Sequence, residues 1–66
     1  MITVNNREIN YKIGMSVYDA LQESGESINN MTLVVVDEKV IALDKLKDEI
    51  LNNGMNIKLL HIVSGG

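Results

Sequence analysis

Few side chains in this sequence have the type and spacing that catalysis needs. His61 is the sole histidine and there is no cysteine, so we expect no zinc or iron–sulfur site and no paired nucleophile. Ser16 precedes a helical pattern and is expected to cap a helix rather than attack a substrate. The adjacent carboxylates Asp37-Glu38 and Asp48-Glu49 would point apart on a strand or helix, so neither pair forms an acid–base dyad. The side chains therefore predict a protein that is not an enzyme and binds no cofactor or metal of its own.

The C-terminal sequence Ser64-Gly65-Gly66 offers chemistry that needs no side chain. Glycine has no Cβ, so a diglycine tail can enter a narrow channel that any other residue would block. A terminal α-carboxylate is ionised at neutral pH. It becomes an acylating group only when adenylation by ATP turns one of its oxygens into a leaving group. We therefore expect Gly66 to be the reactive position and residues 64–66 to form a flexible tail. The alternative is a frayed end without a role.

The composition limits the size of the protein and the class of its partners. Sixty-six residues suit one small domain over residues 1–66, and two tyrosines as the sole aromatic residues predict an aliphatic core. Nine acidic and six basic residues give a net charge of −3, which argues against binding to nucleic acid or to an anionic membrane surface. No apolar run approaches the ~18 residues of a membrane span, and the N-terminus lacks a signal-peptide pattern. We therefore expect a cytoplasmic protein.

Alternating polarity near the N-terminus predicts a β-hairpin. Apolar and polar residues alternate over residues 2–5 and again over residues 8–13, with turn-forming Asn5-Asn6-Arg7 between them. One face of the second strand would carry Ile9, Tyr11 and Ile13.

A helix of two to three turns is expected next. Ser16 and Asp19 have the spacing of a capping box, and Gly25 stands where a left-handed C-cap is expected. Four residues at helical spacing would face the core: Val17, Ala20, Leu21 and Ser24.

The second half predicts a second hairpin and a final strand. Residues 32–36 are apolar on both faces, as in a central strand, and Asp37-Glu38 form a tight turn to a strand over residues 39–41. The last strand runs from about residue 56 to residue 62. A short helix or 3₁₀ turn, with Asp44 as a possible N-cap, is expected from the spacing of Leu43, Leu46, Ile50 and Leu51.

This order of elements predicts an α+β fold of the ubiquitin-like β-grasp type, with a mixed sheet of about five strands around one helix. The last strand would insert beside the first and parallel to it. A ferredoxin-like sandwich is the alternative, but it needs two full helices on one face of the sheet.

The whole chain resembles the ThiS family, the sulfur carriers of thiamine biosynthesis, which lie within the ubiquitin-like group that includes the small subunit of molybdopterin synthase. The family usually has Asn-Gly where this chain has Asp37-Glu38. The total length of this chain suits the thiamine carriers better than the molybdopterin subunit, which is usually longer. The matching stretches are residues 1–8, 16–21, 32–41, 53–57 and 62–66.

The resemblance implies a mechanism and a set of partners. A ThiF-type adenylyltransferase, using ATP and magnesium, would adenylate Gly66. A persulfide sulfur donor would then replace the AMP to leave a thiocarboxylate, and a thiazole synthase of the ThiG type would draw that sulfur into thiamine. Three alternatives stay open: a sulfur carrier for another pathway such as molybdopterin synthesis, a ubiquitin-like protein modifier, and a β-grasp interaction module with an incidental tail.

The last strand also predicts a partner interface. If Ile57 and Leu59 point into the core, Leu60 and Ile62 point outward by the two-residue period of a strand. Exposed apolar residues in a cluster mark partner surfaces. The alternative is that the segment over residues 43–53 covers both side chains.

Overall fold

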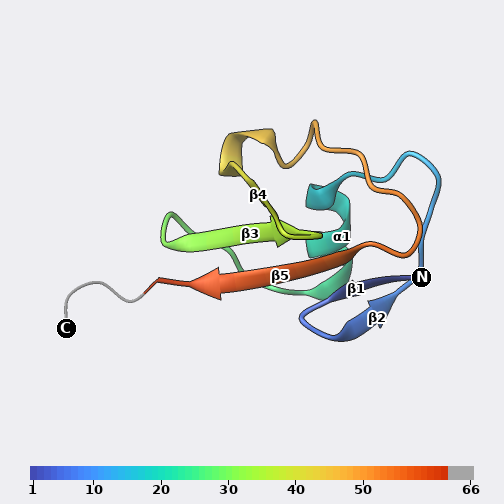
Figure 1. Cartoon of the computed structure of the whole chain (residues 1–66), viewed down its shortest axis with the longest axis horizontal. Coiled ribbons are helices and arrows are strands. Elements are labelled where there is room, and N and C mark those ends of the chain that lie inside the picture. Colours follow the sequence, from blue (N-terminus) through green and yellow to red (C-terminus); the bar gives the residue numbers. More distant parts are fainter. Residues whose placement is uncertain (63–66) are drawn as a thin grey trace.

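The computed structural model, which describes residues 1–62, is a five-stranded mixed sheet with one α-helix packed against it (Figure 1). Strand β5 lies at the centre, parallel to β1 and antiparallel to β3, in the order β2-β1-β5-β3-β4. The elements are β1 (Ile2–Val4), β2 (Arg7–Ile9), α1 (Val17–Ser24), β3 (Thr32–Val36), β4 (Lys39–Ile41), the 3₁₀ turn η1 (Leu43–Lys45) and β5 (Asn56–His61). This arrangement confirms the predicted β-grasp. Residues 1–62 contain no second α-helix, so the ferredoxin-like alternative is wrong.

The first hairpin is shorter than its alternating pattern predicts. Asn5 and Asn6 form the turn at positive φ, and β2 ends at Ile9, which pairs with Ile2 at the start of β1. Beyond Ile9 the chain has no partner strand, so the alternation no longer corresponds to one buried face. Ile13, predicted to share the face of Ile9, is 95% exposed instead.

Helix α1 has the ends that its sequence predicts. The Ser16 hydroxyl accepts a hydrogen bond from the Asp19 backbone N–H at 3.2 Å, and the Asp19 carboxylate accepts one from the Ser16 N–H at 3.0 Å. Gly25 adopts a φ of 77°, the left-handed conformation that glycine adopts without a Cβ clash. All four residues predicted to face the core are buried: Val17, Ala20, Leu21 and Ser24.

The segment after β4 follows its tertiary contacts rather than its helical spacing. Only Leu43–Lys45 form a 3₁₀ turn, and its N-cap is Ala42, so the prediction of Asp44 as N-cap is wrong. The first-turn N–H groups of α1 have no partner within the helix, and two of them bond to this segment. The Val17 N–H donates to the Glu49 carbonyl at 2.9 Å, and the Tyr18 N–H donates to the Leu46 carbonyl at 3.1 Å.

The core lies between the sheet and α1 and is aliphatic, as the composition predicts. Its members come from every strand, from the helix and the residue Met15 before it, and from the segment after η1. They are Ile2, Val4, Ile9, Met15, Val17, Ala20, Leu21, Val34, Val36, Ile41, Leu46, Leu51, Ile57 and Leu59.

The turn between β3 and β4 gives a first prediction. Asp37 and Glu38 both adopt positive φ, at 46° and 72°, which suits Asn-Gly and strains residues that carry a Cβ. Glu38→Gly is expected to raise the free energy of unfolding by about 0.5–1 kcal/mol, after the entropic penalty of glycine in the unfolded chain is subtracted. Asp37 is left in place because its carboxylate accepts the Asn56 backbone N–H at 2.9 Å. Urea denaturation measures the change.

The matched control is Glu8→Gly in strand β2, where the backbone has an ordinary negative φ and the side chain is exposed. That substitution is expected to lower stability, since glycine weakens a strand. A lower urea midpoint for Glu38→Gly than for the unsubstituted protein would contradict the account of the turn.

Candidate functional site

Strand β5 leads from the centre of the sheet toward the C-terminus (Figure 1). It pairs with β3 over residues 57–61 and with β1 at Asn56 and Ile57, so its backbone is paired along the strand up to His61. The next residue is still attached, because the Ile62 N–H donates to the Met31 carbonyl at 2.7 Å. The predicted tail residues Ser64, Gly65 and Gly66 lie outside the described residues. The candidate site within the structure is therefore the end of β5 and the sheet face beside it.

The outward orientation predicted for Leu60 and Ile62 is confirmed. Ile57 and Leu59 are 1% and 6% exposed and point into the core, whereas Leu60 and Ile62 are 52% and 49% exposed. The segment over residues 43–53 leaves both side chains accessible, so the alternative that it covers them is wrong. The partner-binding role of these two residues stays a prediction.

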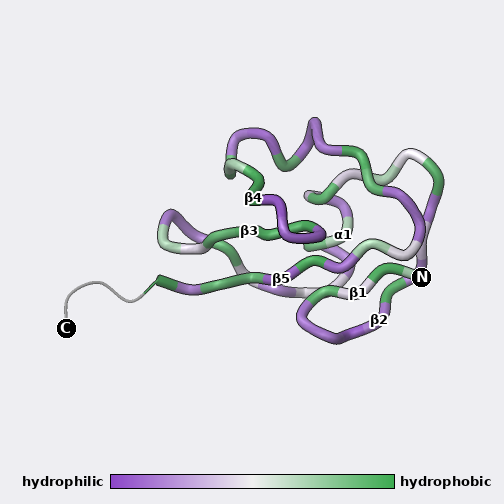
Figure 2. Tube along the Cα trace, in the orientation of Figure 1, coloured by the Kyte–Doolittle hydropathy of each residue, from purple (hydrophilic) through white to green (hydrophobic). Residues whose placement is uncertain are grey.

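Apolar side chains from three strands share this outer face of the sheet. Leu33 lies directly opposite Leu60, and Val35 lies directly opposite Val40, so all four project from the same side as Ile62. Figure 2 shows the hydrophobic colour along β3 and toward the end of β5. We name Leu33, Val35, Val40, Leu60 and Ile62 the outer apolar patch. Strand β3 is apolar on both faces as predicted, but its second face is open because this patch has no covering layer within residues 1–62.

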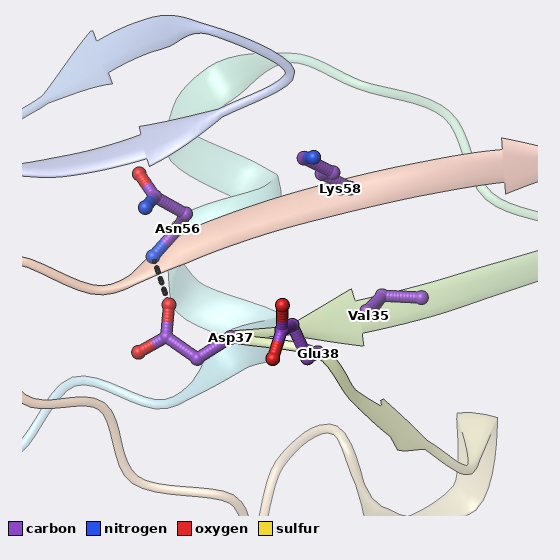
Figure 3. A pocket seen from close by; sticks show the side chains of 5 residues that line it. All are labelled: Val35, Asp37, Glu38, Asn56 and Lys58. Atoms are coloured by element: carbon purple, nitrogen blue, oxygen red, sulfur yellow. Dashed lines mark hydrogen bonds between the residues drawn. The ribbon is translucent and has the colours of Figure 1, made fainter.

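A polar hollow lies at the other end of the same face, where the β3–β4 turn meets β5 (Figure 3). It measures about 420 Å³ and is lined by Val35, Asp37, Glu38, Asn56 and Lys58. The Asp37 carboxylate holds the start of β5 through its bond to the Asn56 N–H, so it is a structural group. Apart from the link between Lys39 and Glu49 at 3.7 Å, no ion pair is present among residues 1–62, and Lys58 is therefore not paired with either turn carboxylate. The outer face thus has an apolar end near residue 62 and a polar end near the turn.

His61 lies at the end of β5 on the opposite side of the strand from Leu60. Its Nδ1 atom is 3.1 Å from the hydroxyl oxygen of Thr32, the residue directly opposite on β3. Among residues 1–62, no other titratable side chain forms a hydrogen bond or ion pair with this ring. The sequence does not reveal the contact with Thr32, because 29 positions separate the two residues.

Two kinds of feature are absent from the described part of the chain. No helix in it is long and apolar enough to span a membrane. It also contains no group of three or more histidine, cysteine, aspartate or glutamate side chains that could hold a metal ion.

Comparison with known proteins identifies the family. No curated protein matches the sequence. Among solved structures, the chain is similar to the crystal structure of the thiamine biosynthesis protein ThiS from Geobacter metallireducens, with a TM-score of 0.77 and 16% sequence identity. That likeness covers 98% of this chain and 97% of the other, and at such low identity it shows the shared fold. The family model of the ThiS family matches residues 2–66, and the chain therefore belongs to the ThiS family.

Proposed function

We propose that this protein is a sulfur carrier of thiamine biosynthesis and that it carries the sulfur on the carboxylate of Gly66. The observation that carries the proposal is the ThiS-family match, which extends through the terminal diglycine to residue 66. The geometry supports it in a second way. Strand β5 is central in the sheet and is the last element before the terminal residues of the sequence, so the fold holds the chain firmly up to Ile62.

The chemistry needs only the chain's own carboxylate. A carboxylate oxygen of Gly66 attacks the α-phosphate of ATP, which forms an acyl adenylate and releases pyrophosphate. The terminal sulfur of a persulfide donor then attacks the acyl carbon, and AMP leaves. The product is an acyl disulfide. A thiol attacks the donor's sulfur in it and forms a new disulfide with the donor, and the acyl sulfur leaves as the thiocarboxylate, whose sulfur passes to the thiazole ring. ATP and magnesium belong to the partner enzyme in this scheme.

The outer apolar patch is the surface on which we expect partners to dock. An apolar centre with a polar rim is the usual anatomy of a protein interface, and this face has both. Leu60 and Ile62 are only six and four residues before Gly66 in the sequence, so a partner bound over them is within a short length of chain from the reactive end. We propose that a ThiF-type adenylyltransferase and a ThiG-type thiazole synthase dock here in turn.

Residues 1–66 are proposed to act as one domain that ends in the tail of residues 64–66. The buried cluster draws its members from Ile2 to Leu59, which leaves no separate core at either end of the described chain. A unit of this size can leave one enzyme and dock on the next with its tail as the carried group.

Intact-mass spectrometry tests the proposal. The protein is incubated with a ThiF-type enzyme, ATP, magnesium and a persulfide donor, and the control omits ATP. We expect an ATP-dependent gain equal to the exchange of one oxygen for one sulfur. Isopeptide-linked conjugates to other proteins would instead indicate a ubiquitin-like modifier. No ATP-dependent change with the activating enzyme encoded in the same organism would overturn the proposal.

A further inference from the structure

The hydroxyl of Thr32 is one of the few polar side-chain groups that are buried in this small protein. Thr32 is the first residue of β3 and is only 2% exposed, and it lies directly opposite His61 near the end of the carrier's sheet. Its Oγ1 atom is 3.1 Å from Nδ1 of His61 and 3.2 Å from the Asn29 backbone nitrogen. A buried hydroxyl destabilises a fold unless it is hydrogen-bonded, and this one has partners on two separate elements.

The hydrogen bonds around Thr32 can be satisfied in either tautomer of His61. The hydroxyl accepts the Asn29 N–H and has one hydrogen to donate, either to the Asn29 side-chain oxygen at 3.3 Å or to Nδ1 of His61. When it donates to Asn29, a protonated Nδ1 of His61 can donate to Thr32. The contact is therefore kept whichever ring nitrogen carries the proton.

The backbone beside this contact holds the next residue of the chain. The Asn29 side-chain oxygen accepts the Met31 N–H at 2.7 Å, and the Met31 carbonyl accepts the Ile62 N–H at 2.7 Å. Two separate links thus join the end of β5 to the chain at the start of β3. One is the side-chain contact between Thr32 and His61, and the other is the backbone hydrogen bond from Ile62 to Met31. We name Asn29, Met31, Thr32, His61 and Ile62 the exit cluster.

We propose that Thr32 and His61 are positioning residues that fix the direction in which the chain leaves β5 toward its reactive end, an inference that rests on the proposed function. Gly66 is four residues beyond Ile62, so the point at which the chain leaves the sheet sets the region that the carboxylate can reach. An ordered exit means that the activating enzyme does not have to order these residues itself, which lowers the entropic penalty of binding. A valine and a leucine at these positions could pack together but could not form the polar side-chain link between β3 and β5.

Paired substitutions separate the hydrogen bond from packing. Thr32→Val removes the hydroxyl and keeps the shape, whereas Thr32→Ser keeps the hydroxyl. His61→Leu removes the ring nitrogen, whereas His61→Asn keeps a polar atom near the position of Nδ1. We expect Thr32→Val and His61→Leu to raise the KM for the carrier in adenylation by about three- to tenfold at unchanged kcat, since only the ordering of the exit is lost.

Two further results are expected if the exit cluster acts as a unit. The Ile62 amide should exchange with solvent several-fold faster in Thr32→Val and His61→Leu than in Thr32→Ser and His61→Asn, as measured by NMR on the free protein. The double variant should show the KM of either single variant rather than the product of both effects. His61 is exposed, so His61→Leu keeps the test valid even if Thr32→Val lowers stability.

The outcomes distinguish this inference from the function on which it rests. An unsubstituted protein that is not adenylated overturns the sulfur-carrier proposal and the positioning role with it. An adenylated protein whose KM and Ile62 exchange are the same in Thr32→Val as in Thr32→Ser, and in His61→Leu as in His61→Asn, overturns the positioning role alone.

Discussion

Deletion of Gly66 is expected to abolish ATP-dependent sulfur loading and to leave the unfolding midpoint unchanged. The described core ends at Leu59, so removal of residue 66 takes no member of it away. The reactive carboxylate, however, moves back by one residue, about 3.5 Å of extended chain, and no longer reaches the α-phosphate in the activating enzyme. A displacement of about 1 Å is already enough to lower a rate a hundredfold. Intact-mass spectrometry after incubation with enzyme, ATP and sulfur donor measures the loss.

A reversible control separates chain length from damage to the protein. One alanine appended after Gly66 should block loading completely, because the carboxylate then lies on the wrong residue. Its removal by a carboxypeptidase should restore loading in the same sample. Sulfur loading of the extended protein at the unsubstituted rate would show that the carboxylate of Gly66 is not the reactive group.

Leu60→Asp is expected to weaken binding of the activating enzyme by about 30- to 1000-fold, the range for loss of a central apolar contact in an interface. Leu60 is 52% exposed and lies on the outer face beside Lys58, so an aspartate there remains hydrated in the free protein and the fold is retained. In the complex the same carboxylate would be buried against an apolar surface without a partner. Titration calorimetry with a ThiF-type enzyme measures the change in Kd.

Ile13→Asp is the matched control for this surface. Ile13 is 95% exposed, apolar and located between β2 and α1, outside the outer apolar patch. The same change of charge and polarity there should leave Kd within about twofold of the unsubstituted value, because scattered surface apolar residues carry little binding energy. Equal losses of affinity for Leu60→Asp and Ile13→Asp would show that the patch is not the docking surface.

The parts of the fold that could be predicted from sequence are those set by local chemistry. The box formed by Ser16 and Asp19 involves residues three positions apart, and Gly25 adopts its left-handed conformation from its own lack of a Cβ. The orientation of Leu60 follows equally simply, since alternation along β5 places it opposite to Leu59 once one of them is buried.

The predictions that were wrong depend on which strand lies beside which. Alternation up to Ile13 predicts a longer strand, but β2 can extend only as far as its partner β1, and pairing ends at Ile9. The predicted 3₁₀ turn forms at Leu43–Lys45, but the helical spacing beyond it does not produce further helix, because Leu51 and Ile50 pair with the chain just before α1. The Leu51 N–H donates to the Met15 carbonyl at 2.9 Å, and Ile50 forms a bridge with Ser16. Such pairings are tertiary contacts, and no local sequence pattern predicts them.

The same distinction holds for the candidate site: one of its features could be predicted from the sequence and the other could not. The outer face could be predicted because it needs only the two-residue period of β5. The exit cluster could not, since Thr32 and His61 meet only through the register of β3 against β5. A threonine at the start of an apolar run is indistinguishable in sequence from any other β-branched strand residue.

Fragmentation of the sulfur-loaded protein by tandem mass spectrometry tests the central claim most directly. The central claim is that the chain's own terminal carboxylate, and no side chain, carries the sulfur. We predict that the oxygen-for-sulfur exchange is retained in every fragment that contains Gly66 and is absent from every fragment that ends before it. Sulfur located on a side chain, or a protein whose mass does not change when ATP, donor and activating enzyme are all present, would contradict the account.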